Sequence, residues 1–215
     1  MNVLFLDVYP SNKFRISKDQ NGGYGTGNNY GNTLFTKFLN FYVNKSIEFP
    51  PLYCVQVMGE IKKSNHNIEY KKEISDVEKF DFFVVNSSIV AFETEIKTIK
   101  TLSQLGKLVF AIGPFASANP KKFIEAGAKV IKGEPEMFFY NFSKTINELK
   151  SLPDLIDNFP IVDINLLSLP AWDVIFKNYI PRMKFLGSGP AVNINASRGC
   201  PYSCFYYCVY PLQQG

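Results

Sequence analysis

The sequence has little histidine, no long apolar run and no block of like charge. Its one histidine, His66, lies in a predicted turn between a helix and a strand, where we expect a solvated side chain. No stretch of roughly 18 apolar residues occurs, so no membrane span is expected. Basic residues form pairs such as Lys62-Lys63 and the net charge is only +4, so nucleic-acid binding is not indicated. The first residues lack the basic region of a secretory signal, and we expect a cytoplasmic protein.

Cysteine is also scarce, but three of the four cysteines are clustered. Cys200, Cys204 and Cys208 fall within nine residues, whereas Cys54 stands alone on a predicted core helix. A disulfide framework is not expected without an export signal, because thiols stay reduced in the cytosol. Clustered cysteines in a reducing compartment are typical of metal or iron–sulfur binding. We therefore predict that the three C-terminal cysteines are metal ligands.

The first 150 residues alternate between short apolar runs typical of buried strands and segments with helical periodicity. We predict five strands, at residues 3–8, 67–70, 82–86, 108–112 and 128–131. We predict helices at residues 52–63, 92–105 and 120–126, and a further helix from the turn at 133–135 through Leu149. This alternation predicts an α/β fold, a five-stranded doubly wound parallel sheet with helices on both faces.

Ligands of such sheets bind outside the carboxyl ends of the strands. The loop after the first strand is rich in glycine between residues 21 and 31, and glycine lets the backbone approach a ligand closely. It has neither the Gly-Lys-Ser/Thr ending of a phosphate loop nor the spacing of a dinucleotide loop, so a flexible surface loop is the alternative. Glu93 and Glu95 begin a helix, where we interpret them as favourable to its dipole. The candidate cofactor-binding residues at this edge are Gly23, Gly25, Gly27, Ser87, Ser88, Gly113, Pro114, Gly133 and Glu134.

Residues 151–190 carry a proline about every ten residues, which predicts a linker with a short helix near 172–176. Residues 192–195 look like a strand, and it runs into the sequence Ser197-Arg198-Gly199-Cys200-Pro201-Tyr202-Ser203-Cys204 with an aromatic residue just before Cys208. This segment resembles the cluster motif of radical S-adenosylmethionine (SAM) enzymes, and more narrowly of their cobalamin-binding subgroup. Two further segments resemble that subgroup: Leu169-Pro170-Ala171-Trp172-Asp173 and the turn Gly133-Glu134-Pro135-Glu136.

The resemblance implies a flavodoxin-like, cobalamin-binding α/β domain at 1–150, a linker at 151–190 and the start of a radical SAM barrel at 191–215. It implies that Cys200, Cys204 and Cys208 hold three irons of a [4Fe-4S] cluster, whose fourth iron SAM chelates. Reductive cleavage of SAM then yields a radical, and cobalamin typically relays a methyl group. A reductant protein and a small-molecule or peptide substrate are implied as partners, with no nucleic acid and no membrane.

The chain departs from the family in three ways. Three residues separate Cys204 from Cys208 where the family has two, and the extra residue could be absorbed in a bulge or could spoil the cluster. The chain stops seven residues after Cys208, so we expect a truncated barrel and a poorly packed segment at 191–215. No Asp-x-His-x-x-Gly run supplies a lower cobalt ligand, an absence that several relatives share.

Four alternatives stay open. Structural zinc needs four ligands, and only three cysteines lie close together. The cysteine motif could be a decayed site without metal. A methylthiotransferase would need three cysteines in its first domain, where this chain has only Cys54. Finally, the chain could be a stand-alone corrinoid-binding or interaction domain that is not itself an enzyme.

Overall fold

Six parallel strands form the central sheet of the protein. The structure is a computed structural model, and it describes residues 1–11, 15–18, 26–28, 30–44, 50–157, 163–177, 191–195, 198 and 202. The strands lie in the order β4-β1-β5-β6-β7-β8, and every neighbouring pair is parallel. Their bounds are β1 (Asn2–Leu6), β4 (Asn67–Lys71), β5 (Phe82–Asn86), β6 (Leu108–Ile112), β7 (Lys129–Ile131) and β8 (Leu155–Ile156). The five predicted strands are confirmed, and β8 is a sixth that lies within the predicted linker.

The first strand lies inside the sheet, between β4 and β5. Val3 of β1 is in register with Ile68 on one side and with Phe82 on the other. The chain therefore adds β4 on one side of β1 and all later strands on the other, the order of flavodoxin-like sheets. Strand order reverses between β1 and β5, and a ligand crevice is expected outside the carboxyl ends of these two strands.

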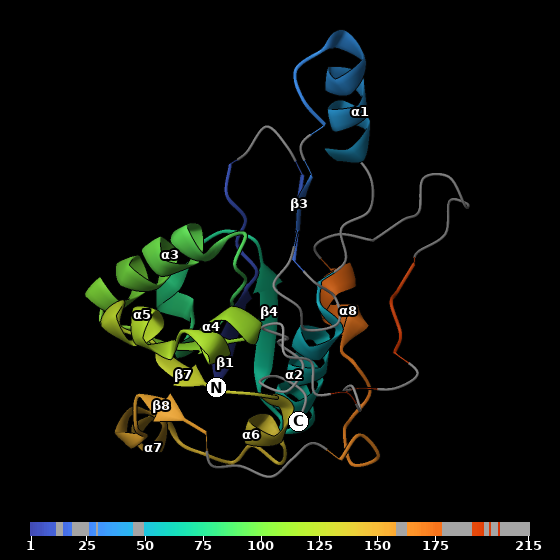
Figure 1. Cartoon of the computed structure of the whole chain (residues 1–215). Helices are drawn as coiled ribbons and strands as arrows, with labels where there is room; N and C mark the ends of the chain where they lie inside the picture. The colour runs from blue at the N-terminus through green and yellow to red at the C-terminus, as the bar shows by residue number, and fades with distance from the viewer. Residues whose placement is uncertain are drawn as a thin grey trace.

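Helices cover both faces of the sheet, as the sequence predicts (Figure 1). Successive residues of β1 point to opposite faces, so Val3 and Phe5 enter one apolar core while Leu4 and Leu6 enter the other. The first core is closed by α2 (Leu52–Lys63), α6 (Glu136–Phe139), α7 (Ile146–Ser151) and α8 (Trp172–Phe176). The second is closed by α3 (Phe92–Gln104), α4 (Pro114–Ala118) and α5 (Pro120–Glu125), with the short 3-10 helix η1 (Val77–Lys79) at its margin.

The predicted helix through Leu149 is wrong, because two short helices replace it. α6 ends at Phe139, and Asn141 then adopts a left-handed backbone with φ of 48°, which a helix does not continue through. Thr145 starts α7 with a capping box: its hydroxyl accepts from the Glu148 amide, and the Glu148 carboxylate accepts from the Thr145 amide. The signal for this second start, a threonine three residues before a glutamate, is present in the sequence.

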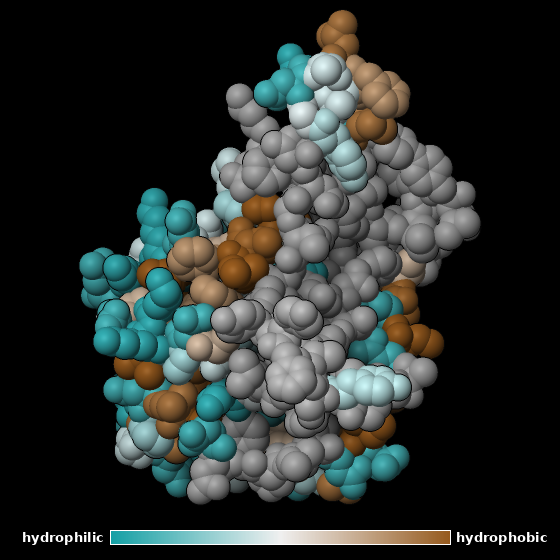
Figure 2. All heavy atoms as spheres, viewed as in Figure 1, coloured by the Kyte–Doolittle hydropathy of each residue, from teal (hydrophilic) through white to brown (hydrophobic). Residues whose placement is uncertain are grey.

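The long segment after β1 also contains elements that the sequence analysis did not predict. β2 (Arg15–Ser17) pairs antiparallel with β3 (Thr26–Asn28), and α1 (Leu34–Asn44) follows. In Figure 1, α1 stands away from the sheet and its helices. Four of its apolar residues are more than half exposed, and they form the hydrophobic tip in Figure 2: Leu34, Phe35, Phe38 and Phe41.

Residues 163–177 of the predicted linker pack against α2. The Ala171 amide donates to the Val55 carbonyl over 3.1 Å, and Ser168 donates to the Glu60 carboxylate through both its amide and its hydroxyl. The short helix predicted near residues 172–176 is confirmed as α8. The predicted strand at 192–195 is not: residues 191–195 form no strand, and Ile194 is 85% exposed. A parallel strand needs a hydrogen-bonded neighbour, and the described residues provide none here.

Among the described residues, no helix has both the length and the apolar character that crossing a bilayer requires.

Candidate functional site

A cluster of three buried charges lies at the carboxyl ends of β1 and β5. The Lys18 ammonium contacts Asp7 Oδ1 at 2.9 Å and Glu95 Oε1 at 2.9 Å. Asp7 directly follows β1, Lys18 follows β2, and Glu95 lies in the first turn of α3. The side chains of all three are at most 1% exposed. Buried charges of this kind are stable only when they are paired and hydrogen-bonded.

Hydrogen bonds from β5 and its loop complete this cluster. Lys18 Nζ also donates to the Asn86 carbonyl over 3.2 Å, and the Asn86 amide group donates to Asp7 Oδ1 over 3.2 Å. The Tyr53 hydroxyl donates to Asn86 Oδ1. The Ser88 amide donates to both oxygens of Glu95 at 3.1 and 3.0 Å. Each member of the cluster therefore has several partners, and the end of β5 is held rigidly.

Burial and pairing act against each other on the acids of this cluster. Burial disfavours the charged form of Asp7, but the Lys18 ammonium holds the pKa of Asp7 below its ordinary value. Burial outweighs the same ammonium at Glu95, so the pKa of that carboxyl is raised. Burial also disfavours the Lys18 ammonium, yet the two carboxylates raise the pKa of Lys18. The Lys18 side chain therefore stays protonated. It serves as an electrostatic anchor and not as an acid that gives up its proton.

The anchor ties the segment after β1 to the switch point of the sheet. Sequence analysis did not predict it, because Glu95 looks like a helix-start residue and no motif singles out Asp7 or Lys18. Glu95 does lie in the first turn of α3, but its carboxylate is buried and paired with Lys18. The available signal for a buried charge cluster was Asp7, a charged residue that directly follows the apolar strand β1.

Three of the other predicted residues at this edge are hydrogen-bonded to α4. The Ser87 hydroxyl accepts from the Ala116 amide over 2.8 Å, which joins the loop after β5 to α4. The Ser117 hydroxyl donates to the Gly113 carbonyl over 2.9 Å and accepts from the Gly133 amide over 3.0 Å, which joins the loops after β6 and β7. The prediction that these loops share the carboxyl edge of one parallel sheet is confirmed.

The predicted serines do not face outward, however. Ser87 and Ser88 are each 1% exposed, and both hydroxyls are bonded within the protein. Gly113, at the end of β6, has a φ of 103°, and a Cβ there would lie 2.9 Å from the Ser87 carbonyl oxygen. Glycine is therefore required at this position, for its conformation and for the close approach of the two loops.

Several predicted site residues lie outside the part of the chain that the structure describes. These are Gly23, Gly25 and the three clustered cysteines, Cys200, Cys204 and Cys208. Gly27 lies in β3, opposite Ile16 of β2. Cys54 is fully buried on α2, as predicted, and burial raises the pKa of its thiol. Within the described residues, no group of three or more histidine, cysteine, aspartate or glutamate side chains could hold a metal ion.

Arg198, two residues before Cys200, contacts the turn after β7. Its Nη1 atom lies 2.6 Å from Glu136 Oε1 and 3.4 Å from Glu134 Oε1. The Glu134 side chain is 12% exposed. Pro114, which follows Gly113, and Pro135, which follows Glu134, are both buried. Residues some 60 positions apart in the chain therefore meet at the sheet edge where ligands of such folds bind.

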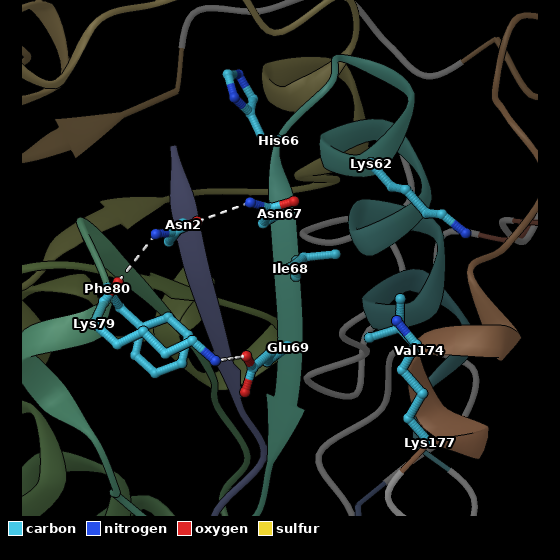
Figure 3. A pocket seen from close by; sticks show the side chains of 10 residues that line it. All are labelled: Asn2, Lys62, His66, Asn67, Ile68, Glu69, Lys79, Phe80, Val174 and Lys177. Atoms are coloured by element: carbon cyan, nitrogen blue, oxygen red, sulfur yellow. Dashed lines mark hydrogen bonds and ion pairs between the residues drawn. The ribbon is translucent and has the colours of Figure 1, made fainter.

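Cavities among the described residues lie away from the charge cluster. A groove of about 320 Å³ runs along the outer edge of the sheet between β4 and α8, with Lys62, Lys177 and Glu69 around it (Figure 3). His66 lies in this groove beside the amino end of β4, and its Nδ1 atom is 3.1 Å from the amino group of Met1. The predicted solvated turn residue is thus a partly buried one, and it is remote from the charge cluster. A second cavity of about 330 Å³ lies between α2 and residues 164–170, with Asn193 and Arg198 at its wall.

Comparison with known proteins gives one informative similarity. The chain is 25% identical over 177 residues to an uncharacterized methyltransferase, sll1242, of Synechocystis sp.. The alignment covers 75% of this chain but 30% of that protein, so the chain spans less than a third of its relative's length. No protein-family model matches the chain.

Proposed function

We propose that this chain forms the corrinoid-binding and cluster-binding part of a cobalamin-dependent radical SAM enzyme that transfers a methyl group. The observation that carries the proposal is the contact of Arg198 with Glu136. It brings the residues that lead into the cysteine motif to the carboxyl edge of a flavodoxin-like sheet. The similarity to a protein named as a methyltransferase supports methyl transfer in a general sense.

The carboxyl edge suits a corrinoid in its arrangement. Hydrogen bonds of the Ser87 and Ser117 hydroxyls connect the segments after β5, β6 and β7, so these segments offer a preformed backbone surface. The chain's one histidine lies at the opposite end of β1, so these residues would supply no imidazole ligand to a corrinoid bound here. Bound cobalamin would supply a cobalt centre that carries the methyl group.

The residues of this chain would bind and orient these cofactors. Lys18 holds the segment after β1 against the switch point, which limits water access to that end of β5. Cys200, Cys204 and Cys208 are proposed as ligands of a [4Fe-4S] cluster, which would supply the electron for SAM cleavage. A reductant protein would reduce that cluster.

A stand-alone corrinoid-binding domain is the second candidate. It is favoured by the absence of a strand at 191–195, where a radical SAM barrel would begin. Under this alternative the protein binds cobalamin and takes up no iron.

Two measurements test the proposal. Titration with hydroxocobalamin, followed by visible absorbance, should show saturable binding. Glu134→Trp at the carboxyl edge should weaken it, whereas Leu105→Trp, on the exposed turn before β6, should not. Anaerobic reconstitution with iron and sulfide should give cluster absorbance that the triple Cys200, Cys204 and Cys208→Ser variant lacks. Cobalamin binding without iron uptake would favour the second candidate. The absence of both cobalamin binding and iron uptake would overturn both candidates.

A further inference from the structure

The turn after β7 presents two carboxylates to one arginine side chain. We call residues 133–136 the acidic turn; its two carboxylates, from Glu134 and Glu136, both point to Nη1 of Arg198. The Glu136 side chain is fully buried, and that of Arg198 is 13% exposed. Both partners of the shorter contact are therefore largely shielded from water, where a charged hydrogen bond is strongest.

The acidic turn is rigid without Arg198. The Gly133 amide donates to the Ser117 hydroxyl over 3.0 Å, which anchors the start of the turn to α4. Its end runs into α6, whose Phe139 is fully buried in the core between α2 and the sheet. Because a hydrogen bond to α4 and the packing of α6 fix the two ends of the turn, the two carboxylates form a receptor of set geometry.

Arg198 favours the charged form of the buried Glu136 carboxyl. Burial raises the pKa of Glu136 to about 7, even though the Arg198 guanidinium opposes the shift. Glu136 Oε2 is buried and has no hydrogen-bond partner among the described residues. Arg198 contacts both carboxylates, and its removal would take a charge partner from the fully buried Glu136 carboxylate.

We propose that the acidic turn is a socket that receives Arg198 and fixes the backbone leading into the cysteine motif. Glu136 is then a positioning residue: it touches no cofactor, and it acts by holding the segment that carries Cys200. This inference rests on the proposed function for its role in cluster binding, but the docking itself does not depend on any metal.

Hydrogen exchange measured on the metal-free protein tests the docking. In Glu136→Gln, amides at residues 191–198 should exchange on the order of tenfold faster than in the wild type, since a charged hydrogen bond is worth at least the free energy of a factor of ten. Arg198→Met should have the same effect. Arg198→Lys should have a smaller effect, because lysine keeps the positive charge but lacks the forked donors of the guanidinium. Asp173→Asn is the matched control, because it removes the exposed Lys62–Asp173 ion pair elsewhere on the same C-terminal half.

Unchanged exchange at residues 191–198 in both Glu136→Gln and Arg198→Met, with both variants folded, would overturn the socket. Iron uptake separates this result from the proposed function. If wild type forms a cluster, Glu136→Gln should lose cluster absorbance and Arg198→Lys should retain part of it. Iron uptake equal to that of the wild type in both variants would refute a positioning role. If wild type forms no cluster, the proposed function fails while the exchange result still decides the docking.

Discussion

Lys18 supports the end of β5 through a buried charge cluster. Its ammonium contacts both Asp7 and Glu95. Removing one member of a buried ion pair leaves uncompensated charge, so Lys18→Met should destabilise the protein by about 3–5 kcal/mol. Urea unfolding followed by circular dichroism measures this loss.

Lys107→Met is the control for that substitution. Lys107 pairs with Glu78, whose side chain is 89% exposed, so its loss should cost no more than about 1 kcal/mol. Similar losses in the two variants would mean that the buried cluster contributes no more than a surface pair.

Glu136 should make stability depend on pH. Its pKa is about 7 in the folded protein against an ordinary 4.5, so between these values the folded state binds more protons than the unfolded state. Its contribution to stability is therefore present at pH 4.5 and is lost as the pH rises toward 7. Chemical unfolding at pH 5 and pH 8 should show Glu136→Gln gaining stability relative to the wild type at the higher pH. A constant difference would contradict the shifted pKa.

Single residues were the hardest features to predict from the sequence. Asp7 and Glu95 were visible as polar residues beside apolar ones, but nothing in the spacing connects them to Lys18. Their cluster forms only because the sheet brings the ends of β1 and β5 together and β2 returns Lys18 to that point. Gly113 and Gly133, in contrast, could be placed at the correct edge because Gly113 directly follows β6 and Gly133 lies two residues after the end of β7.

At the scale of elements, predictability followed the length and isolation of the apolar runs. β5 has four apolar residues before Asn86 and β6 has five before Gly113, and both strands were predicted at their observed bounds. β8 has two residues and no periodicity of its own, and it exists because β7 offers it an edge. The strand expected at 192–195 has the right composition but no neighbour among the described residues.

The contact between α2 and residues 163–171 gives a prediction at this scale. A Cβ on Gly59 would lie 2.5 Å from the Leu169 carbonyl oxygen, so Gly59→Ala should push that segment away from the helix. The detached segment should be cut faster by protease within residues 163–171. Alanine is otherwise the better helix former by about 1 kcal/mol, so α2 itself should stay folded.

Lys63→Ala provides the control on the same helix, since Lys63 is exposed. Equal cleavage of the wild type and Gly59→Ala would show that the close approach does not hold the segment in place.

At the scale of the whole molecule, thiol reactivity separates the α/β body from the cysteine motif. Cys54 is fully buried and its pKa is raised by burial, so it should resist iodoacetamide at neutral pH until the protein is unfolded. In the metal-free protein we expect Cys200, Cys204 and Cys208 to react readily. Mass spectrometry of the alkylated peptides reports each site. Protection of all three without iron would indicate a compact C-terminal module in place of the start of a barrel.

The interior position of β1 has a consequence for how the chain is made. Val3 must pair with Ile68 and with Phe82, which the ribosome adds much later. At roughly 5–20 residues per second, β5 is synthesised roughly 4–16 seconds after β1. For most of that interval the apolar strand has neither partner, since β4 is also synthesised late, and chaperones that recognise extended apolar segments would bind the strand in this window.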